Sequence, residues 1–152
     1  MIALLRGVNV GKAKRVPMAE LRRLLEGLGC TDVRTLLNSG NAVFCAPVAR
    51  TPAKIAAELA HELRAQLGVD VPVIVERASD LDVIVRGNSL SFGDADHSRL
   101  LVAFTADARA LATLDAIRPL LAKGEQLAIG AKAAYLLCAK GILASRAGEA
   151  LL

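Results

Sequence analysis

The spacing of apolar positions divides the first 77 residues into six elements. Residues 2–5 form an apolar run too short for a helix, which predicts a buried strand. Apolar side chains recur at helical spacing over 17–28, behind Pro17, and over 52–67, behind Thr51 and Pro52. Runs at 33–37, 42–45 and 71–75 are rich in β-prone residues. The predicted order is strand, helix, strand, strand, helix, strand, which is that of a ferredoxin-like unit.

The second half of the chain repeats most of this pattern. A strand is predicted at 100–104, a helix at 108–121, a hairpin formed by 126–129 and 134–138, and a closing helix near Ser145. Between the halves, the pattern over residues 79–87 predicts a short helix, and residues 88–99 are polar, which is typical of a linker. We therefore expect an α+β protein with tandem ferredoxin-like βαββαβ units, mainly antiparallel sheets and helices packed on one face. Its parts are a unit at 1–77, a helix and linker at 78–99, and an incomplete second unit at 100–152, which suggests a duplication.

The segment between the first strand and the first helix is the most basic part of the chain. Gly7 and Gly11 permit positive φ, Asn9 tolerates it, and successive N–H groups of such a loop can surround an anion. Four cations fall within ten residues: Arg6, Lys12, Lys14 and Arg15. The loop is one residue shorter than the P-loop of NTPases and has Ala13 in place of the Mg²⁺-binding hydroxyl, which excludes that class. A phosphate site and a solvated connecting loop both stay open.

A turn of Asn38, Ser39, Gly40 and Asn41 joins the two middle strands of the first unit. If the first strand is central in the sheet, this turn lies near the basic loop. Ser39 and Asn41 would then donate neutral hydrogen bonds to a bound anion. The alternative is that these residues are there for turn geometry alone. The complete predicted anion site is Arg6, Asn9, Lys12, Lys14, Arg15, Ser39 and Asn41.

The net charge of +4 comes entirely from residues 1–34, which contain seven Lys and Arg and three Asp and Glu. Positive and negative charges are equal in number in the remaining residues. This asymmetry predicts an anionic partner, either a nucleic-acid backbone or a phosphorylated small molecule. Solubility alone is the alternative. With three Phe, one Tyr and no Trp, the chain has few aromatic platforms for unpaired bases, which disfavours generic single-strand binding.

Three stretches resemble the bacterial family DUF1697, a domain of unknown function: IALLRGVNVGKAKRVPMAELRRLLEGLG, DVRTLLNSGNAVF and YLLCAKGILASRAGEALL. The resemblance covers nearly the whole chain. It implies an α/β protein of ferredoxin-like β-α-β units and no established activity. The chain departs from the family pattern at Lys12, Leu36, Asn38 and Ser89. Similar proteins usually continue beyond Leu152 into a basic, Trp-containing tail, so truncation and an incomplete site are among the expectations.

The sequence contains no arrangement that points to catalysis, a metal or a cofactor. An enzyme would need the additional tail or a second subunit. Asp94, Asp96 and His97 fall in one polar loop without a second cluster, so we interpret them as solvated and expect no metal and no cofactor. His61 lies off the apolar stripe of its helix and is predicted to be a surface residue. Ser145 is interpreted as a helix N-cap rather than an anion ligand.

Cysteine spacing and hydropathy indicate the cellular compartment of the protein. Cys30, Cys45 and Cys138 are odd in number and widely separated, which predicts three small, buried, free thiols in a reducing compartment. The chain has no recognisable signal peptide and no apolar run near the roughly 20 residues of a membrane helix. We expect a cytoplasmic protein without a membrane partner. The leading hypothesis is an anion-binding module that uses residues 6–15; a self-associating or protein-interaction module with exposed strand edges is the alternative.

Overall fold

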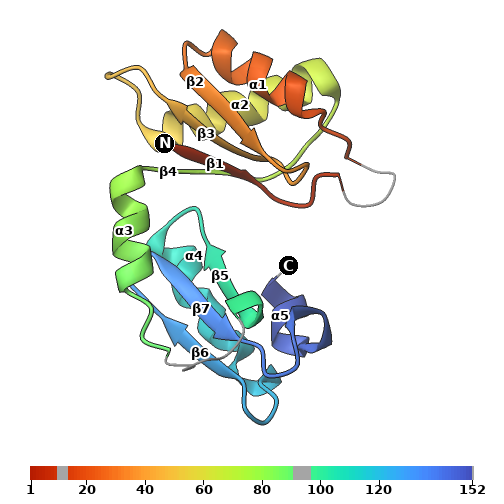
Figure 1. Ribbon diagram of the computed structural model, residues 1–152, viewed down its shortest axis with the longest axis vertical. Helices are drawn as coiled ribbons and strands as arrows, with labels where there is room; N and C mark the ends of the chain where they lie inside the picture. The colour runs from red at the N-terminus through yellow and green to blue at the C-terminus, as the bar shows by residue number, and fades with distance from the viewer. Residues whose placement is uncertain (10–13, 91–96, 152) are drawn as a thin grey trace. The chain divides into compact units, whose positions relative to one another are not determined.

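The computed structural model describes residues 1–9, 14–90 and 97–151, and every structural statement concerns these residues (Figure 1). The chain separates into two compact units, Met1–Ala78 and Ser79–Leu152. Each unit contains one antiparallel sheet with helices packed against it. The predicted α+β class with two mainly antiparallel sheets is therefore confirmed.

The first unit has the predicted succession of elements. They are β1 (Ile2–Leu5), α1 (Met18–Gly27), β2 (Thr31–Leu36), β3 (Asn41–Cys45), α2 (Pro52–Leu67) and β4 (Val73–Glu76). The strand order is β2-β3-β1-β4, and all neighbours are antiparallel. The ends of α2 follow from local chemistry, because the Thr51 side chain accepts a hydrogen bond from the Lys54 N–H and Gly68 ends the helix in the left-handed conformation.

One face of the first sheet forms a core with α1 and α2. The inward residues of β1 and β3, such as Ala3 and Phe44, are buried. The helices contribute apolar stripes that are also buried: Leu21, Leu24 and Leu25 from α1, and Ile55, Leu59 and Leu63 from α2. This packing fixes β1 as an inner strand, with β3 on one side and β4 on the other.

The opposite face of this sheet carries exposed and half-buried side chains. Strand register aligns Arg34, Val43, Ile2 and Glu76 in one row across the four strands. A second row consists of Leu36, Asn41, Leu4 and Ile74. Paired residues of antiparallel strands project to the same face, so these two rows define the open face of the first sheet.

The second unit has a three-stranded sheet in the order β5-β7-β6, which corresponds to β1-β3-β2 of the first unit. Its strands are β5 (Leu100–Phe104), β6 (Gln126–Ile129) and β7 (Ala133–Leu137). Its helices are α3 (Ala78–Arg86), α4 (Ala108–Thr113) and α5 (Arg146–Leu151), with 3-10 helices η1 (His97–Arg99), η2 (Leu114–Leu120) and η3 (Ile142–Ala144). The Ser145 side chain accepts a hydrogen bond from the Gly148 N–H at 2.9 Å, which confirms the predicted N-cap of α5.

Helices cover both faces of the second sheet, unlike the predicted one-face packing. All five residues of β7 are buried. One face packs against α4, η2 and α5, and the other packs against Leu81 and Ile84 of α3. The Tyr135 hydroxyl donates a hydrogen bond of 2.5 Å to the Ile84 carbonyl. Helix α3 therefore packs within this unit, because its apolar stripe and the second apolar face of β7 bury each other.

The predicted helix over 108–121 is instead α4 followed by the tighter η2. Pro119 lies inside η2. Proline has no N–H to donate to the preceding turn, and it disfavours the α conformation at the residue before it. A short 3-10 segment at the end of the helix is the usual result of such a constraint.

The three cysteines are free thiols, but the prediction that all three are buried is wrong for Cys45, which lies on the same face of β3 as the exposed Val43. Cys45 is exposed, whereas Cys30 and Cys138 are buried, and burial raises the pKa of both buried thiols. We expect iodoacetamide to modify Cys45 in the native protein and to reach Cys30 and Cys138 only on unfolding, because the thiolate is the nucleophile. The raised pKa values also mean that unfolding releases these two protons more readily, so stability should fall above about pH 8.5.

Mass spectrometry of the native and urea-unfolded protein measures the order of modification. A Cys45→Ser variant is the control, because it should resist native modification altogether. Equal native rates of modification at Cys45 and Cys138 would contradict the difference in exposure between these two thiols.

Candidate functional site

The β1–α1 loop and the β2–β3 turn are joined by the side chain of Asn9. Its amide nitrogen donates to the carbonyls of Val16 and Asn38 at 2.9 and 2.8 Å. Its amide oxygen accepts the Val16 N–H at 2.9 Å. The side chain therefore uses both donor hydrogens and one acceptor to hold the loop closed and to bind it to the turn. The predicted proximity of loop and turn is confirmed.

The loop backbone adopts several left-handed conformations. Gly7, Asn9 and Lys14 have φ values of 68°, 58° and 51°. The Asn9 N–H donates to the Lys14 carbonyl at 3.1 Å, and the Arg6 N–H donates to the Pro72 carbonyl at 3.2 Å. Tertiary hydrogen bonds thus hold both ends of the described loop in conformations that are uncommon for residues other than glycine.

Gly40 lies directly beneath the start of this loop. Its carbonyl accepts the Leu5 N–H at 3.2 Å, and its φ is 78°. A Cβ atom at this position would lie 2.5 Å from Cγ2 of Val8 and 2.9 Å from Cβ of Leu5. Glycine is required here both for the backbone conformation and for the close approach of β1.

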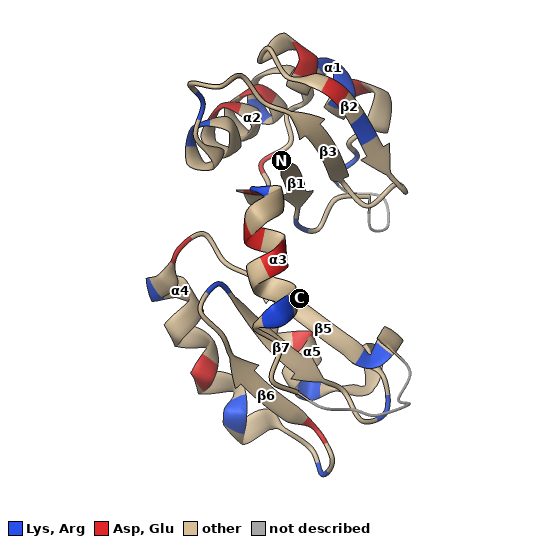
Figure 2. Ribbon diagram, turned by 60° about the vertical axis from the view of Figure 1, so that its left-hand side comes forward, with Lys and Arg blue, Asp and Glu red and all other residues tan. Residues whose placement is uncertain are grey.

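Arg6, Lys14 and Arg15 are exposed at this end of the first unit, on both sides of the stretch that the structure does not describe. Lys12 lies outside the described residues. Figure 2 shows the basic positions on the two arms of the loop and on β2. In the turn, the Ser39 hydroxyl donates to the Leu36 carbonyl at 3.2 Å and accepts from the Asn41 amide at 3.0 Å. Contacts of these residues with an anion stay predictions.

The turn also presents two large apolar side chains that sequence reasoning assigned to a strand. Leu36 is 62% exposed and Leu37 is 78% exposed. Leu37 has a φ of 55°, in the left-handed region. Two consecutive leucines before an Asn-Ser-Gly turn are also what a buried strand end looks like, so the local pattern gave no signal of their exposure. We call Leu36 and Leu37 together the leucine tip.

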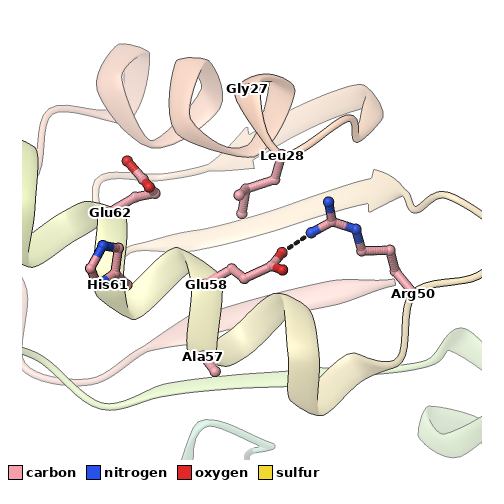
Figure 3. A pocket seen from close by; sticks show the side chains of 7 residues that line it. All are labelled: Gly27, Leu28, Arg50, Ala57, Glu58, His61 and Glu62. Carbon is pink, nitrogen blue, oxygen red and sulfur yellow. Dashed lines mark ion pairs between the residues drawn. The ribbon is translucent and has the colours of Figure 1, made fainter.

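A separate hollow of the first unit lies between the end of α1 and α2 (Figure 3). It measures about 440 Å³ and is lined by Leu28, Arg50, Glu58, His61 and Glu62, with Gly27 and Ala57. Arg50 and Glu58 form an ion pair with each other. His61 is exposed, as predicted, and has no hydrogen-bond or ion-pair partner among the described residues. The His61 imidazole has no partner to orient it, and the charges of Arg50 and Glu58 neutralise each other. These residues therefore do not form an acid–base site.

Across residues 1–9, 14–90 and 97–151, no group of three His, Cys, Asp or Glu side chains could hold a metal ion. Asp94 and Asp96 of the discounted acidic trio lie outside those ranges. No helix in them is long and apolar enough to cross a membrane. The basic loop beside the leucine tip is therefore the candidate site with the most distinctive chemistry.

Residues 1–135 match the family described as "Protein of unknown function (DUF1697)". The chain belongs to this family, which confirms the resemblance. No curated protein matches the chain.

Among solved structures, the chain is similar to the conserved bacterial protein SP0830 from Streptococcus pneumoniae. The two are 24% identical, with a TM-score of 0.71, and the alignment covers 90% of this chain and 75% of SP0830. At this level of identity, the likeness establishes a shared fold.

Proposed function

We propose that this protein binds a phosphate-bearing ligand with the cations of its β1–α1 loop, Arg6, Lys14 and Arg15, and with Lys12. The observation that carries the proposal is the Asn9 side chain, which fixes a basic loop to a neighbouring turn through three hydrogen bonds. Residues on either side of a binding loop that are held in place before binding lose less conformational entropy when a ligand arrives. An exposed basic connection with no role in binding has no need of such an anchor.

The distribution of charge supports the same proposal. The excess of four positive charges belongs to residues 1–34, while the other residues are balanced. A ligand with negative charge is drawn to the end of the chain that carries this excess. Within the proposal, Asn9 and Ser39 hold the loop and the turn in place, and the cations contact the phosphate oxygens. Asn41 contributes a neutral amide donor beside them.

The strand order supports a finer description of the fold. An order of β2-β3-β1-β4 with two strand-helix-strand crossovers is that of a ferredoxin-like unit, and the order β5-β7-β6 repeats its first three strands. In this interpretation the second unit is a partial copy of the first. It has neither an equivalent of β4 among its described strands nor a comparable concentration of basic residues.

Charge reversal tests the proposal. We expect a Lys14→Glu, Arg15→Glu double variant to lose at least about tenfold in affinity for oligonucleotides or nucleotide phosphates, because two attractions become repulsions. For an oligonucleotide, the slope of log affinity against log salt should fall by about 2. Fluorescence anisotropy at low salt measures the first ligand class, and ligand-induced change in melting temperature measures the second.

The matched control is Lys123→Glu with Lys140→Glu, which reverses two exposed cations of the second unit. It should leave affinity unchanged. All four side chains are exposed, so neither double variant should shift the melting temperature of the unliganded protein by more than a few degrees. Equal affinities for the two double variants, or no binding of any phosphate ligand by the wild-type chain, would remove the proposed function.

A further inference from the structure

We infer that the phosphates recognised by the basic loop are those of an anionic lipid bilayer, and that the leucine tip inserts into the bilayer surface. The inference rests on the proposed function and names the source of the phosphate ligand. It replaces the expectation from the sequence that the protein has no membrane partner. Its basis is the direct attachment of the two features: the Asn9 side chain of the basic loop donates to the carbonyl of Asn38, the residue that follows Leu37. Cations and exposed apolar side chains are thereby fixed at one end of the sheet.

The exposure of the leucine tip calls for a function. Leu36 and Leu37 leave 62% and 78% of their surface in water. Leu37 does so at a φ of 55°, a conformation that is unfavourable for a branched apolar residue and common for Asn or Gly. A turn chosen for geometry alone would carry a polar residue there. An apolar residue that is both strained and exposed indicates a contact made outside the chain.

The charges around the tip complement an anionic surface. Residues 1–19 and 33–57 include the loop, the turn, β3 and the part of β2 next to the turn, and they contain no Asp or Glu. They contain Arg6, Lys14 and Arg15, together with Arg34, which lies on the same side of β2 as Leu36. Two acidic residues lie on strands of this unit: Asp32 at the end of β2 away from the turn, and Glu76 on β4 at the far edge of the sheet. Each basic residue near an anionic bilayer raises partitioning about fivefold.

Binding of a small phosphorylated molecule does not explain why the leucine tip is exposed, and binding of nucleic acid explains it poorly. A small phosphorylated molecule offers no apolar surface for two leucines to cover. Single-stranded nucleic acid is held by aromatic side chains that stack on bases. Among the described aromatic residues, Phe44 and Tyr135 are buried and Phe104 is partly buried against the core of the second unit; Phe92 lies outside the described residues. A bilayer surface offers anionic headgroups directly above an apolar layer, which matches aliphatic side chains flanked by cations.

Vesicle sedimentation of the full chain tests the inference. We expect binding to vesicles of equimolar phosphatidylcholine and phosphatidylserine, and little binding to phosphatidylcholine alone. A Leu36→Thr, Leu37→Asn variant should bind the anionic vesicles about tenfold more weakly, since it removes the apolar contact. Threonine suits a strand and asparagine suits a positive φ, so this variant should keep the wild-type melting temperature.

The matched control is Val48→Thr, which removes an exposed apolar side chain beyond the end of β3 opposite the leucine tip and should bind vesicles like the wild type. Oligonucleotide or nucleotide binding through Lys14 and Arg15, without vesicle binding, would overturn this inference and leave the proposed function intact. Vesicle binding that is insensitive to the leucine-tip substitutions would also overturn it. If those substitutions instead abolish self-association in vesicle-free sedimentation, the tip is a protein contact and the inference fails.

Discussion

Replacement of Gly40 with alanine is expected to lower the free energy of unfolding of the first unit by about 2–4 kcal/mol. The added Cβ would lie 2.5 Å from Val8 Cγ2 and 2.9 Å from Leu5 Cβ, far inside van der Waals contact. Leu5 Cβ is attached directly to the backbone of β1, so it cannot move without moving the strand. The φ of 78° adds strain for any residue with a side chain. Urea denaturation followed by circular dichroism measures the loss.

Gly68→Ala is the matched control for this experiment. Gly68 has a φ of 65°, close to that of Gly40, but a Cβ there would meet no atom within 4 Å. Its replacement should cost only about 1 kcal/mol, which is the conformational part of the penalty. The difference between the two variants isolates the cost of separating the turn from β1. If both substitutions lower the free energy of unfolding by the same amount, the close packing of the turn against β1 does not contribute to stability.

Asn9→Ala is expected to destabilise the first unit by about 2–3 kcal/mol. The substitution removes three hydrogen bonds to the backbone of Val16 and Asn38. Val16 is fully buried, so water does not easily replace the lost partner of its N–H. Alanine at a φ of 58° is also strained where asparagine is tolerated. Thermal unfolding and amide exchange at Val16 measure the effect.

Two further variants at this position separate the causes. Asn9→Gly relieves the backbone strain and loses the same bonds, so it should be less damaging than alanine by about 1 kcal/mol. Asn9→Asp keeps the acceptor for the Val16 N–H but replaces the amide nitrogen with a carboxylate oxygen that faces the carbonyls of Val16 and Asn38, so it should be no better than glycine. If the aspartate variant is as stable as the wild type, the two donated bonds do not hold the loop.

The same substitutions connect the fold to the proposed function. Asn9 carries no charge, yet Asn9→Gly should weaken anion binding, because the cations would no longer be held in one arrangement before the ligand arrives. Lys14→Glu with Arg15→Glu should weaken binding with little change in stability, since both side chains are exposed. The two kinds of variant therefore distinguish residues that position the site from residues that contact the ligand.

Much of the fold could be read locally. Thr51 and Pro52 mark the start of α2 and Gly68 marks its end, because caps act on the nearest backbone groups. The predicted strand at 100–104 is β5, and the run at 126–129 is β6. The packing of α3 was not predictable in this way. Its short apolar stripe fits a linker helix equally well until β7 is known to be apolar on both faces within the sheet.

Some features of the candidate site could likewise be predicted from the local sequence, and others depend on the tertiary structure. The concentration of cations between β1 and α1 is a property of the chain, and so are the glycine and asparagine positions that permit positive φ. The Asn9 bond to Asn38 joins residues 29 positions apart, and it exists because β1 lies between β3 and β4. The exposure of Leu36 and Leu37 depends on where β2 stops pairing with β3.

By itself, the sequence determined the elements, their order and the sign of the charge at the amino-terminal end, because periodicity, caps and ionisable groups act over a few residues. Only the tertiary structure decided that Asn9 anchors the basic loop, that Gly40 lies under β1, and that two leucines remain in water beside the cations. These features depend on strand pairing and on what each side chain meets across the sheet, and neither follows from neighbours along the chain.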